Sequence, residues 1–289
     1  MKNLILFLLL FITPYIIAQL PEVPQQAWHQ MFNGKDLTGW AVKIRGYDLN
    51  DNFGATFRIS NGNLKVSYDA YDKYSERFGH LFYQQKYSYY LIATEYRFVG
   101  EQANEGPNWA LRNSGIMIHC QPPATMGKNQ DFPISIEVQL LGGNGKDPRT
   151  TCNLCTPGTQ FVMNGQLEKR HCINSTSKTF HGEQWVRAEV LVLGDSLVQH
   201  FVNGEKVIEY AKPQVGGGNV SGHNPADKID EKFLTEGYIS LQSESHPIEF
   251  RKVEIVNLEG CTDPSARNYK AYFVKSNNSL CKYGVKNKK

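Results

Sequence analysis

The sequence predicts an all-β protein: a two-sheet antiparallel β-sandwich with a small disulfide-stapled module at its C-terminal end. Apolar and polar residues alternate in many short segments, Asn-Gly turns separate pairs of these segments, and long stretches with a 3.6-residue period are almost absent. Because such sandwiches reach about 200 to 250 residues, we expect residues 28–258 to form one domain.

The clearest predicted strand covers residues 134–140. Its aliphatic side chains recur at every second position, as in a strand with one buried face. They would point into the core, and the polar side chains would point to the opposite face. The polar set is Ser135, Glu137 and Gln139.

Turn signals divide the rest of the chain. Asn61-Gly62 and Asn203-Gly204 each separate two apolar runs, which predicts β-hairpins. Two stretches rich in glycine and proline, residues 142–184 and 211–232, are predicted to be long loops. Loops of this length in a compact domain commonly act as lids or binding loops.

The N-terminal residues 1–18 have the features of a signal peptide: Lys2, an apolar run and a small residue, Ala18, at the expected cut. The apolar run is too short to span a bilayer. We expect export to the periplasm or the extracellular space, with no transmembrane segment in the mature chain. The formal net charge of +3 is too small for a nucleic-acid partner.

The six cysteines favour disulfides in an exported protein, although six cysteines allow 15 pairings. The CxxC pair at 152 and 155 has zinc or redox spacing, but no second pair accompanies it. One disulfide would staple the first long loop, and another would hold residues 260–283, ahead of a basic tail at 284–289. The preferred set is Cys155 with Cys172, Cys261 with Cys281 and, by elimination, Cys120 with Cys152.

A series of short motifs resembles the 3-keto-disaccharide hydrolase domain family, formerly a domain of unknown function. The motifs occur in the family's order over residues 28–258, and the family's fold is similar to concanavalin A-like lectins and glucanases. Residues 260–283, with their GCTDP start, resemble a small Cys module of secreted Bacteroidetes proteins. The motifs are MFNGKDLTGW at 31–40, NSGI at 113–116, IEVQ at 136–139, GEQW at 182–185, HFVNG at 200–204, GYISLQ at 237–242 and IEFRKV at 248–253.

The resemblance implies an enzyme that cleaves the glycosidic bond of 3-keto-glycosides. A ketone at C3 makes the C2 proton acidic, so that a base can remove it and expel the C1 substituent, after which water adds. Such a site needs a base, a donor or metal for the enolate oxygen, and a proton source for the leaving oxygen.

Two residues are the catalytic candidates. Glu137, in the family-like strand, could act as base or metal ligand. Alternatively, it has no catalytic role and is a solvated carboxylate on an open sheet face. His119 could act as acid, base or metal ligand. Alternatively, it has no catalytic role and is a hydrogen-bonded histidine at a sheet edge. The sequence establishes no cofactor. A divalent metal is the one cofactor considered, and Glu137 and His119 would be its ligands.

The candidate substrate-binding residues come from strands and from the first long loop. In that loop, Arg170, His171 and His181 could close over a sugar, or they could be solvated surface residues. Trp109, in a polar stretch, could stack on a sugar ring. The family-like strands supply Asn113, Gln139 and Gln242.

Two other functions fit the same fold. The first is a non-catalytic carbohydrate-binding, lectin-like module, because a fold alone does not fix function. The second is a hydrolase of unoxidised glucans, although the ExDxxE-type strand of lectin-like glucanases is not evident. An enzyme needs a polar cluster with perturbed pKa values, whereas a lectin needs aromatic surfaces and neutral hydrogen-bonding groups.

Overall fold

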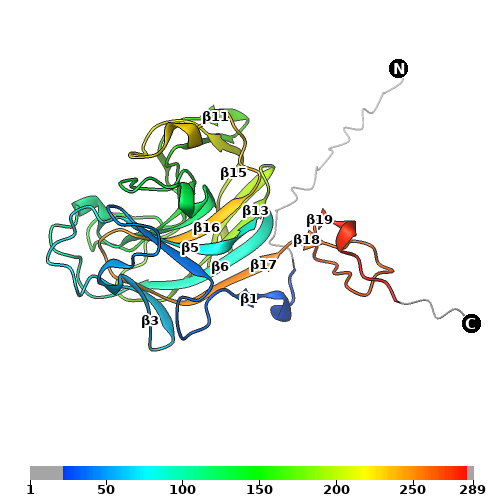
Figure 1. Cartoon of the computed structure of the whole chain (residues 1–289), viewed down its shortest axis with the longest axis horizontal. Helices are drawn as coiled ribbons and strands as arrows, with labels where there is room; N and C mark the ends of the chain where they lie inside the picture. Colours follow the sequence, from blue (N-terminus) through cyan, green and yellow to red (C-terminus); the bar gives the residue numbers. More distant parts are fainter. Residues whose placement is uncertain (1–21, 285–289) are drawn as a thin grey trace, which may run out of the picture.

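The computed structural model describes residues 22–284, and these form two large antiparallel sheets packed into a sandwich (Figure 1). The predicted signal peptide and residues 285–289 of the basic tail lie outside the described residues. The all-β prediction is confirmed: the described part has no α-helix and only short 3-10 turns. These turns are η1 (Gln25–Ala27), η2 (Phe53–Ala55), η3 (Asn108–Ala110), η4 (Pro123–Thr125), η5 (Pro225–Asp227) and η6 (Asn278–Leu280).

The larger sheet has ten strands in the order β11-β10-β15-β14-β13-β6-β17-β4-β3, and β1 pairs with β17 beside this path. Its strands are β1 (His29–Gln30), β3 (Phe57–Ser60), β4 (Asn63–Val66), β6 (Tyr89–Phe98), β10 (Thr159–Met163), β11 (Gln166–Glu168), β13 (Val186–Leu193), β14 (Leu197–Val202), β15 (Glu205–Val215) and β17 (Ile248–Asn257).

The smaller sheet has seven strands in the order β12-β9-β8-β7-β16-β5-β2. One of its faces packs on the larger sheet, and the other carries most of the candidate site. The strands are β2 (Trp40–Ile44), β5 (Gly79–Tyr87), β7 (Asn113–Cys120), β8 (Ile136–Leu141), β9 (Asn153–Cys155), β12 (Cys172–Ile173) and β16 (Gly237–Ser243).

Both Asn-Gly hairpins are confirmed. Asn61 and Gly62, with φ of 51° and 75°, connect β3 to β4, and Asn203 and Gly204, with φ of 50° and 84°, connect β14 to β15. Positive φ at both positions is what the tight hairpin turn requires. Asparagine and glycine adopt this conformation at low cost, so the turns fix the register of both strand pairs.

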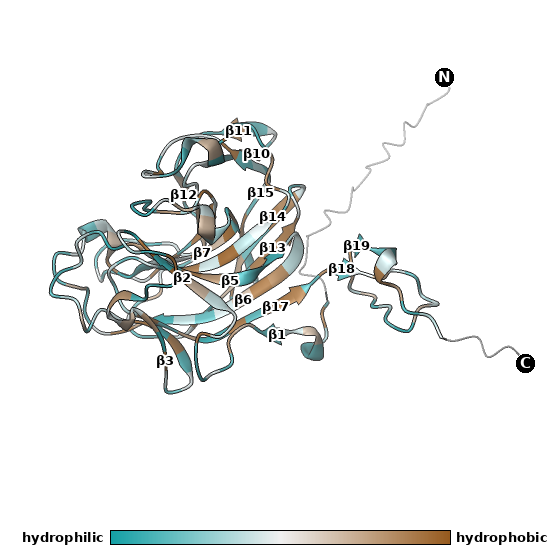
Figure 2. Ribbon diagram, in the orientation of Figure 1, coloured by the Kyte–Doolittle hydropathy of each residue, from teal (hydrophilic) through white to brown (hydrophobic). Residues whose placement is uncertain are grey.

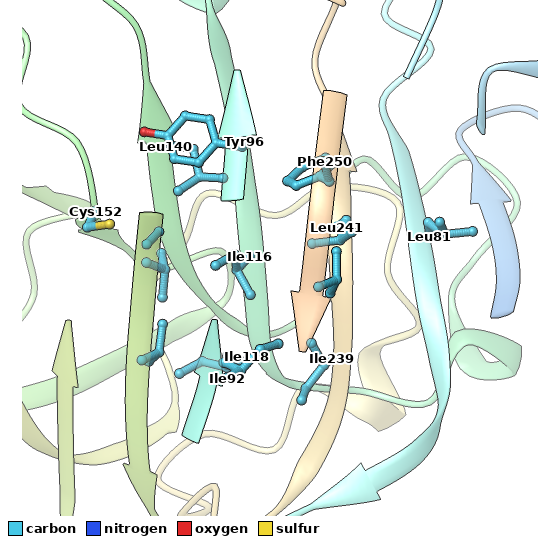
Figure 3. Close-up of a cluster of buried hydrophobic side chains, with 14 of the residues drawn as sticks. Leu81, Ile92, Tyr96, Ile116, Ile118, Leu140, Cys152, Ile239, Leu241 and Phe250 are labelled. Atoms are coloured by element: carbon cyan, nitrogen blue, oxygen red, sulfur yellow. The ribbon is translucent and has the colours of Figure 1, made fainter. Parts of the chain in front are cut away.

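The period-2 pattern of β8 is also confirmed. Ile136, Val138 and Leu140 are fully buried in the main core between the sheets. Figure 3 shows Leu140 with side chains from β7 and β16 beside Ile92 and Tyr96 of the opposite sheet. The alternation is visible as hydrophobic and hydrophilic bands along the strands in Figure 2. It leaves the polar residues of β8 on the outer face of the smaller sheet.

The first predicted loop contains more regular structure than the sequence indicates. Residues 142–184 include the four short strands β9 to β12, and β15 extends to Val215 in the second predicted loop. Strands of two to five residues between glycine and proline turns are too short to show a period. Cys155 and Cys172 are directly paired between β9 and β12, and their disulfide is confirmed, as is that of Cys261 with Cys281.

The prediction of a disulfide between Cys120 and Cys152 is wrong, because both are free and buried. Cys152 belongs to the core between the sheets, whereas Cys120 packs with Phe82 and Met117 on the outer face of the smaller sheet. A bulge in β7 at His119, with φ of 54°, shifts the alternation and turns Cys120 to that outer face. The smaller sheet therefore lies between the two thiols.

The C-terminal module lies beside the end of β17 (Figure 1). Its strands β18 (Glu259–Gly260) and β19 (Lys275–Ser276) pair in parallel. Tyr272 of the module packs on an apolar cluster of the larger sheet that includes Leu91 and Leu191. Over residues 22–284, no helix has both the length and the apolar character needed to cross a membrane.

Candidate active site

A row of polar residues crosses the outer face of the smaller sheet. Strand register places its members side by side, from β9 at one end to β2 at the other. Side chains at registered positions of neighbouring strands point to the same face. In spatial order the polar members of the row are Asn153, Gln139, Gln242, His80 and Lys43, and Gly115 of β7 lies between Gln139 and Gln242.

Two glutamates lie beside this row at the floor of a cavity of about 580 Å³. Glu137 comes from β8 and is 6% exposed, and Glu244 follows β16 and is 3% exposed. Oε1 of Glu137 and Oε2 of Glu244 have no hydrogen-bond partner. Buried polar atoms in folded proteins are nearly always paired, so these unpaired oxygens mark the two carboxyl groups as candidates for ligand contact.

The two carboxyl groups strongly affect each other's protonation. Burial raises the pKa of Glu137 to about 8. Burial, together with the nearby charge of Glu137, raises the pKa of Glu244 well above its usual value. Two adjacent carboxyl groups in a low-dielectric site cannot both ionise readily, so the pair retains at least one proton near neutral pH.

Gly115 provides the space in which these groups meet. A Cβ atom at this position would lie 2.9 Å from Cγ and 3.0 Å from Oε1 of Glu137, and 3.2 Å from Oε1 of Gln242. The backbone of Gly115 is extended, so the requirement for glycine here is steric and not conformational. The missing side chain lets Glu137 and Gln242 lean toward each other across β7.

Gln242, beside Glu137 at Gly115, and His80, its registered neighbour on β5, supply neutral hydrogen-bonding groups on the same face. Both side chains are fully buried, and none of their polar nitrogen or oxygen atoms has a partner. Burial, with the nearby charge of Lys43, lowers the pKa of His80 to about 3, so its imidazole is neutral at physiological pH. Lys43 itself donates hydrogen bonds to the carbonyl oxygens of Tyr47 and Lys128 at 2.9 and 3.1 Å.

The walls of the cavity are largely apolar. They include Trp109, Phe132, Pro157 and Val220, with Cys172 of the loop disulfide on one side. Trp109 is 55% exposed and stacks on Phe78, with ring centroids 6.1 Å apart and planes at 18°.

A segment of the connection between β15 and β16 closes one side of the cavity. Asn219, Val220 and Ser221 of this segment line it. The carboxylate of Asp131 accepts hydrogen bonds from the backbone N–H and the hydroxyl of Ser221, at 2.8 and 2.7 Å. Asp131 therefore fixes this segment over the carboxyl pair.

The structure brings together several residues that the sequence singled out. Glu137, Gln139 and Gln242 share the polar face, and Trp109 and His171 line the same cavity. Oε1 of Gln139 accepts a hydrogen bond from Asn153 at 3.0 Å. Asn113 lies at the start of β7 two residues before Gly115, and its buried Oδ1 has no partner.

Other predicted residues lie elsewhere. His119 lines a separate cavity of about 370 Å³, and burial lowers its pKa to about 4. Arg170 is exposed and bonds to Glu168 at 2.6 Å. His181 lines a third cavity, of about 320 Å³, against Gly143.

Glu137 and His119, the candidate ligands if a metal is bound, do not form one site, because they line different cavities. Among residues 22–284, no three His, Cys, Asp or Glu side chains are arranged to hold a metal ion. The residues present therefore do not fit the predicted two-residue metal site.

Glu244 and His80 are the site residues that sequence reasoning missed. His80 directly precedes the core residue Leu81, and Glu244 lies two residues after Gln242, so both continue an alternating pattern. Extending the β16 alternation past its strand end would put Glu244 on the same face as Gln242, but it would not show that Glu137 lies beside it. Together, a carboxyl pair that retains a proton and two neutral amide or imidazole groups can remove and deliver protons and stabilise an oxyanion.

Comparison with known protein families identifies one domain that covers most of the chain. The family model described as the 3-keto-alpha-glucoside-1,2-lyase-like domain matches residues 27–256. A search of curated proteins finds no match to the chain.

Similar solved structures include two proposed glycosyl hydrolases from Parabacteroides distasonis. They are 18% and 17% identical to this chain, with TM-scores of 0.48 and 0.46, and the alignments cover 82% and 80% of this chain and 98% of each of theirs. A carbohydrate-binding module from Bacillus subtilis is 10% identical, with a TM-score of 0.44, over 76% of this chain and 96% of that chain.

Proposed function

Because the chain belongs to the 3-keto-alpha-glucoside-1,2-lyase-like domain family, we propose that it cleaves 3-keto-glycosides by base-assisted elimination followed by addition of water. Family membership supports a glycoside-acting, carbohydrate-related protein. The observation that carries the finer proposal is the buried Glu137–Glu244 pair at one cavity, with Gln242 beside Glu137 and His80 registered with Gln242 on the same face.

In the proposed reaction, ionised Glu137 removes the C2 proton of the sugar, and the electron pair moves toward the C3 ketone oxygen. The amide of Gln242 and the imidazole N–H of His80 stabilise the resulting enolate. Collapse of the enolate breaks the bond from C1 to the leaving oxygen, which takes a proton from Glu244. Water then adds across C1 and C2, so that the products are a free 3-keto sugar and the aglycone alcohol.

We also propose that the protein acts outside the cytoplasm. The predicted signal peptide motivates this proposal, and the Cys155–Cys172 and Cys261–Cys281 disulfides support it, because such bonds persist mainly in oxidising compartments.

The test is incubation of the purified protein with the α and the β anomer of methyl 3-keto-D-glucoside in D₂O, with and without a chelator, followed by NMR. We expect release of methanol and exchange of deuterium into C2, and no change in unoxidised methyl glucoside. Affinity for unmodified glycans without any turnover would instead favour the carbohydrate-binding module. Activity that is present without the chelator and lost in its presence would show that a metal takes part.

Replacing Gly115 with alanine should lower turnover of a 3-keto-glycoside by at least about tenfold. The added methyl group would overlap Glu137 and Gln242 and push them apart. Steady-state kinetics measure the effect, and circular dichroism checks the fold. Gly218→Ala is the matched control, since a Cβ there meets no atom within 4 Å. Equal activity of Gly115→Ala and wild type would show that the Glu137–Gln242 arrangement is not needed.

A further inference from the structure

The cavity above Glu137 and Glu244 has two chemically different parts. Its floor carries the carboxyl pair, whereas Trp109, Phe132, Pro157 and Val220 provide apolar walls. In the proposed reaction the C1–C2 bond of the sugar must lie at the carboxyl pair. The group leaving from C1 then extends from the floor toward these walls and the mouth.

The charge of the cavity limits what this leaving group can be. Its lining residues include three carboxyl groups, those of Glu137, Glu244 and Asp131, and no lysine or arginine. The raised pKa values of Glu137 and Glu244 show that the floor already disfavours negative charge. A further anion would meet like charges without a counterion, which costs binding free energy.

The walls also offer few hydrogen-bonding groups. Asn219 and His171 are polar lining residues near the rim, but the hydroxyl and N–H of Ser221 already bond to Asp131. The hydroxyl groups of a second sugar would lose hydrogen bonds to water against Phe132, Pro157 and Val220. An aromatic ring would lose none and would gain apolar contact.

The aromatic residues of the wall are arranged to stack. Trp109 lies nearly parallel on Phe78, whose ring centroid is 4.9 Å from that of Phe132. This cluster holds the Trp109 indole in place while leaving more than half of its surface exposed. Offset stacking on such a ring adds binding free energy beyond the buried area.

We propose that these walls bind an uncharged aromatic aglycone, so that the preferred substrates are 3-keto-glycosides of phenols. The assignment of the sugar to the floor rests on the proposed function. The assignment of an aromatic group to the walls rests on their own composition and can be tested without turnover.

The test compares binding of unoxidised β-D-glucosides by calorimetry. We expect wild type to bind p-tolyl glucoside at least about tenfold more tightly than methyl glucoside, cellobiose or 4-carboxyphenyl glucoside. Trp109→Ala should weaken the binding of p-tolyl glucoside until its affinity is close to that of methyl glucoside, whose own affinity should change little. Phe233→Ala is the control, because Phe233 is 48% exposed and lines a different cavity.

The test measures binding and not turnover. Phenols are better leaving groups than alkyl alcohols, so phenyl glycosides would be cleaved faster even if the aglycone made no contact with the walls. Undetectable binding of p-tolyl glucoside, equal binding of cellobiose, or tighter binding of the carboxyphenyl compound would overturn it. If the binding pattern is found but no 3-keto-glycoside is cleaved, the aromatic subsite stands and the proposed function fails. If 3-keto-glycosides are cleaved but p-tolyl glucoside is not bound preferentially, the proposed function stands and the aromatic subsite fails.

Discussion

Replacing Glu137 with glutamine is expected to lower turnover of a 3-keto-glycoside by about a hundredfold or more, equivalent to about 3 kcal/mol of activation free energy. Glutamine keeps the size of the side chain but cannot accept the C2 proton. Rapid-quench or NMR assays at saturating substrate measure the loss. Glu76→Gln, which alters an exposed carboxylate paired with Arg45, is the control and should leave turnover unchanged.

The pH dependence of wild type provides a second check on Glu137. A base with a pKa of about 8 is mostly protonated at pH 7, so kcat/KM should rise between pH 7 and 9. The same raised pKa makes the folded state bind more protons than the unfolded state between pH 4.5 and about 8. Stability should therefore fall as the pH rises through this window.

Glu137→Gln removes this proton linkage, so the variant should be at least as stable as wild type above pH 8. Thermal unfolding across the pH range measures this effect. Equal turnover by the variant and wild type would leave the enzyme assignment intact but move the base to another residue. A large loss of stability at every pH would instead indicate that Glu137 is needed for folding.

Local patterns predicted the parts of the site that lie within regular strands. The alternation of β8 placed Glu137 and Gln139 on the polar face, and the structure bears this out. Trp109 was singled out because it lies in a polar stretch, and it lines the cavity. These predictions needed only the period of a strand or the local composition.

One backbone irregularity accounts for two failures of sequence reasoning. Uninterrupted alternation along β7 would place Cys120 on the same face as Ile118, and His119 on the face of Glu137. The bulge at His119 reverses this, so Cys120 faces away from Cys152 and His119 lines a different cavity. A bulge depends on pairing with a partner strand, and a single sequence does not reveal that pairing.

Long-range assembly explains the remaining omissions. Glu244 lies in a polar stretch beyond the end of β16, where its sequence is typical of a loop. His80 is one histidine in an apolar and aromatic run of β5. Their importance follows from register across β8, β7, β16 and β5, which brings them to one face. Only the order of strands in the sheet establishes this proximity.

Replacing Glu244 with glutamine should also lower turnover strongly, but by an amount that depends on the leaving group. A general acid contributes about a hundredfold or more when the leaving oxygen needs a proton. Methyl 3-keto-glucoside should therefore lose about this much, whereas the p-nitrophenyl compound, whose phenolate leaves without a proton, should lose far less. Wild type and variant are compared with both substrates, and a similar loss for both would contradict the acid role.

The pH profile of Glu244→Gln separates this role from a structural one. In wild type, ionisation of Glu137 gives a rising limb, and loss of the proton of Glu244, whose pKa burial and the charge of Glu137 raise well above its usual value, gives a falling limb. The variant should keep the rising limb and lose the falling one, because only Glu137 still titrates. A variant that keeps both limbs, with activity lowered equally for every leaving group, would show that Glu244 merely supports the shape of the cavity. The proton for the leaving oxygen would then have to come from elsewhere, and His171 at the rim would be the next residue to replace.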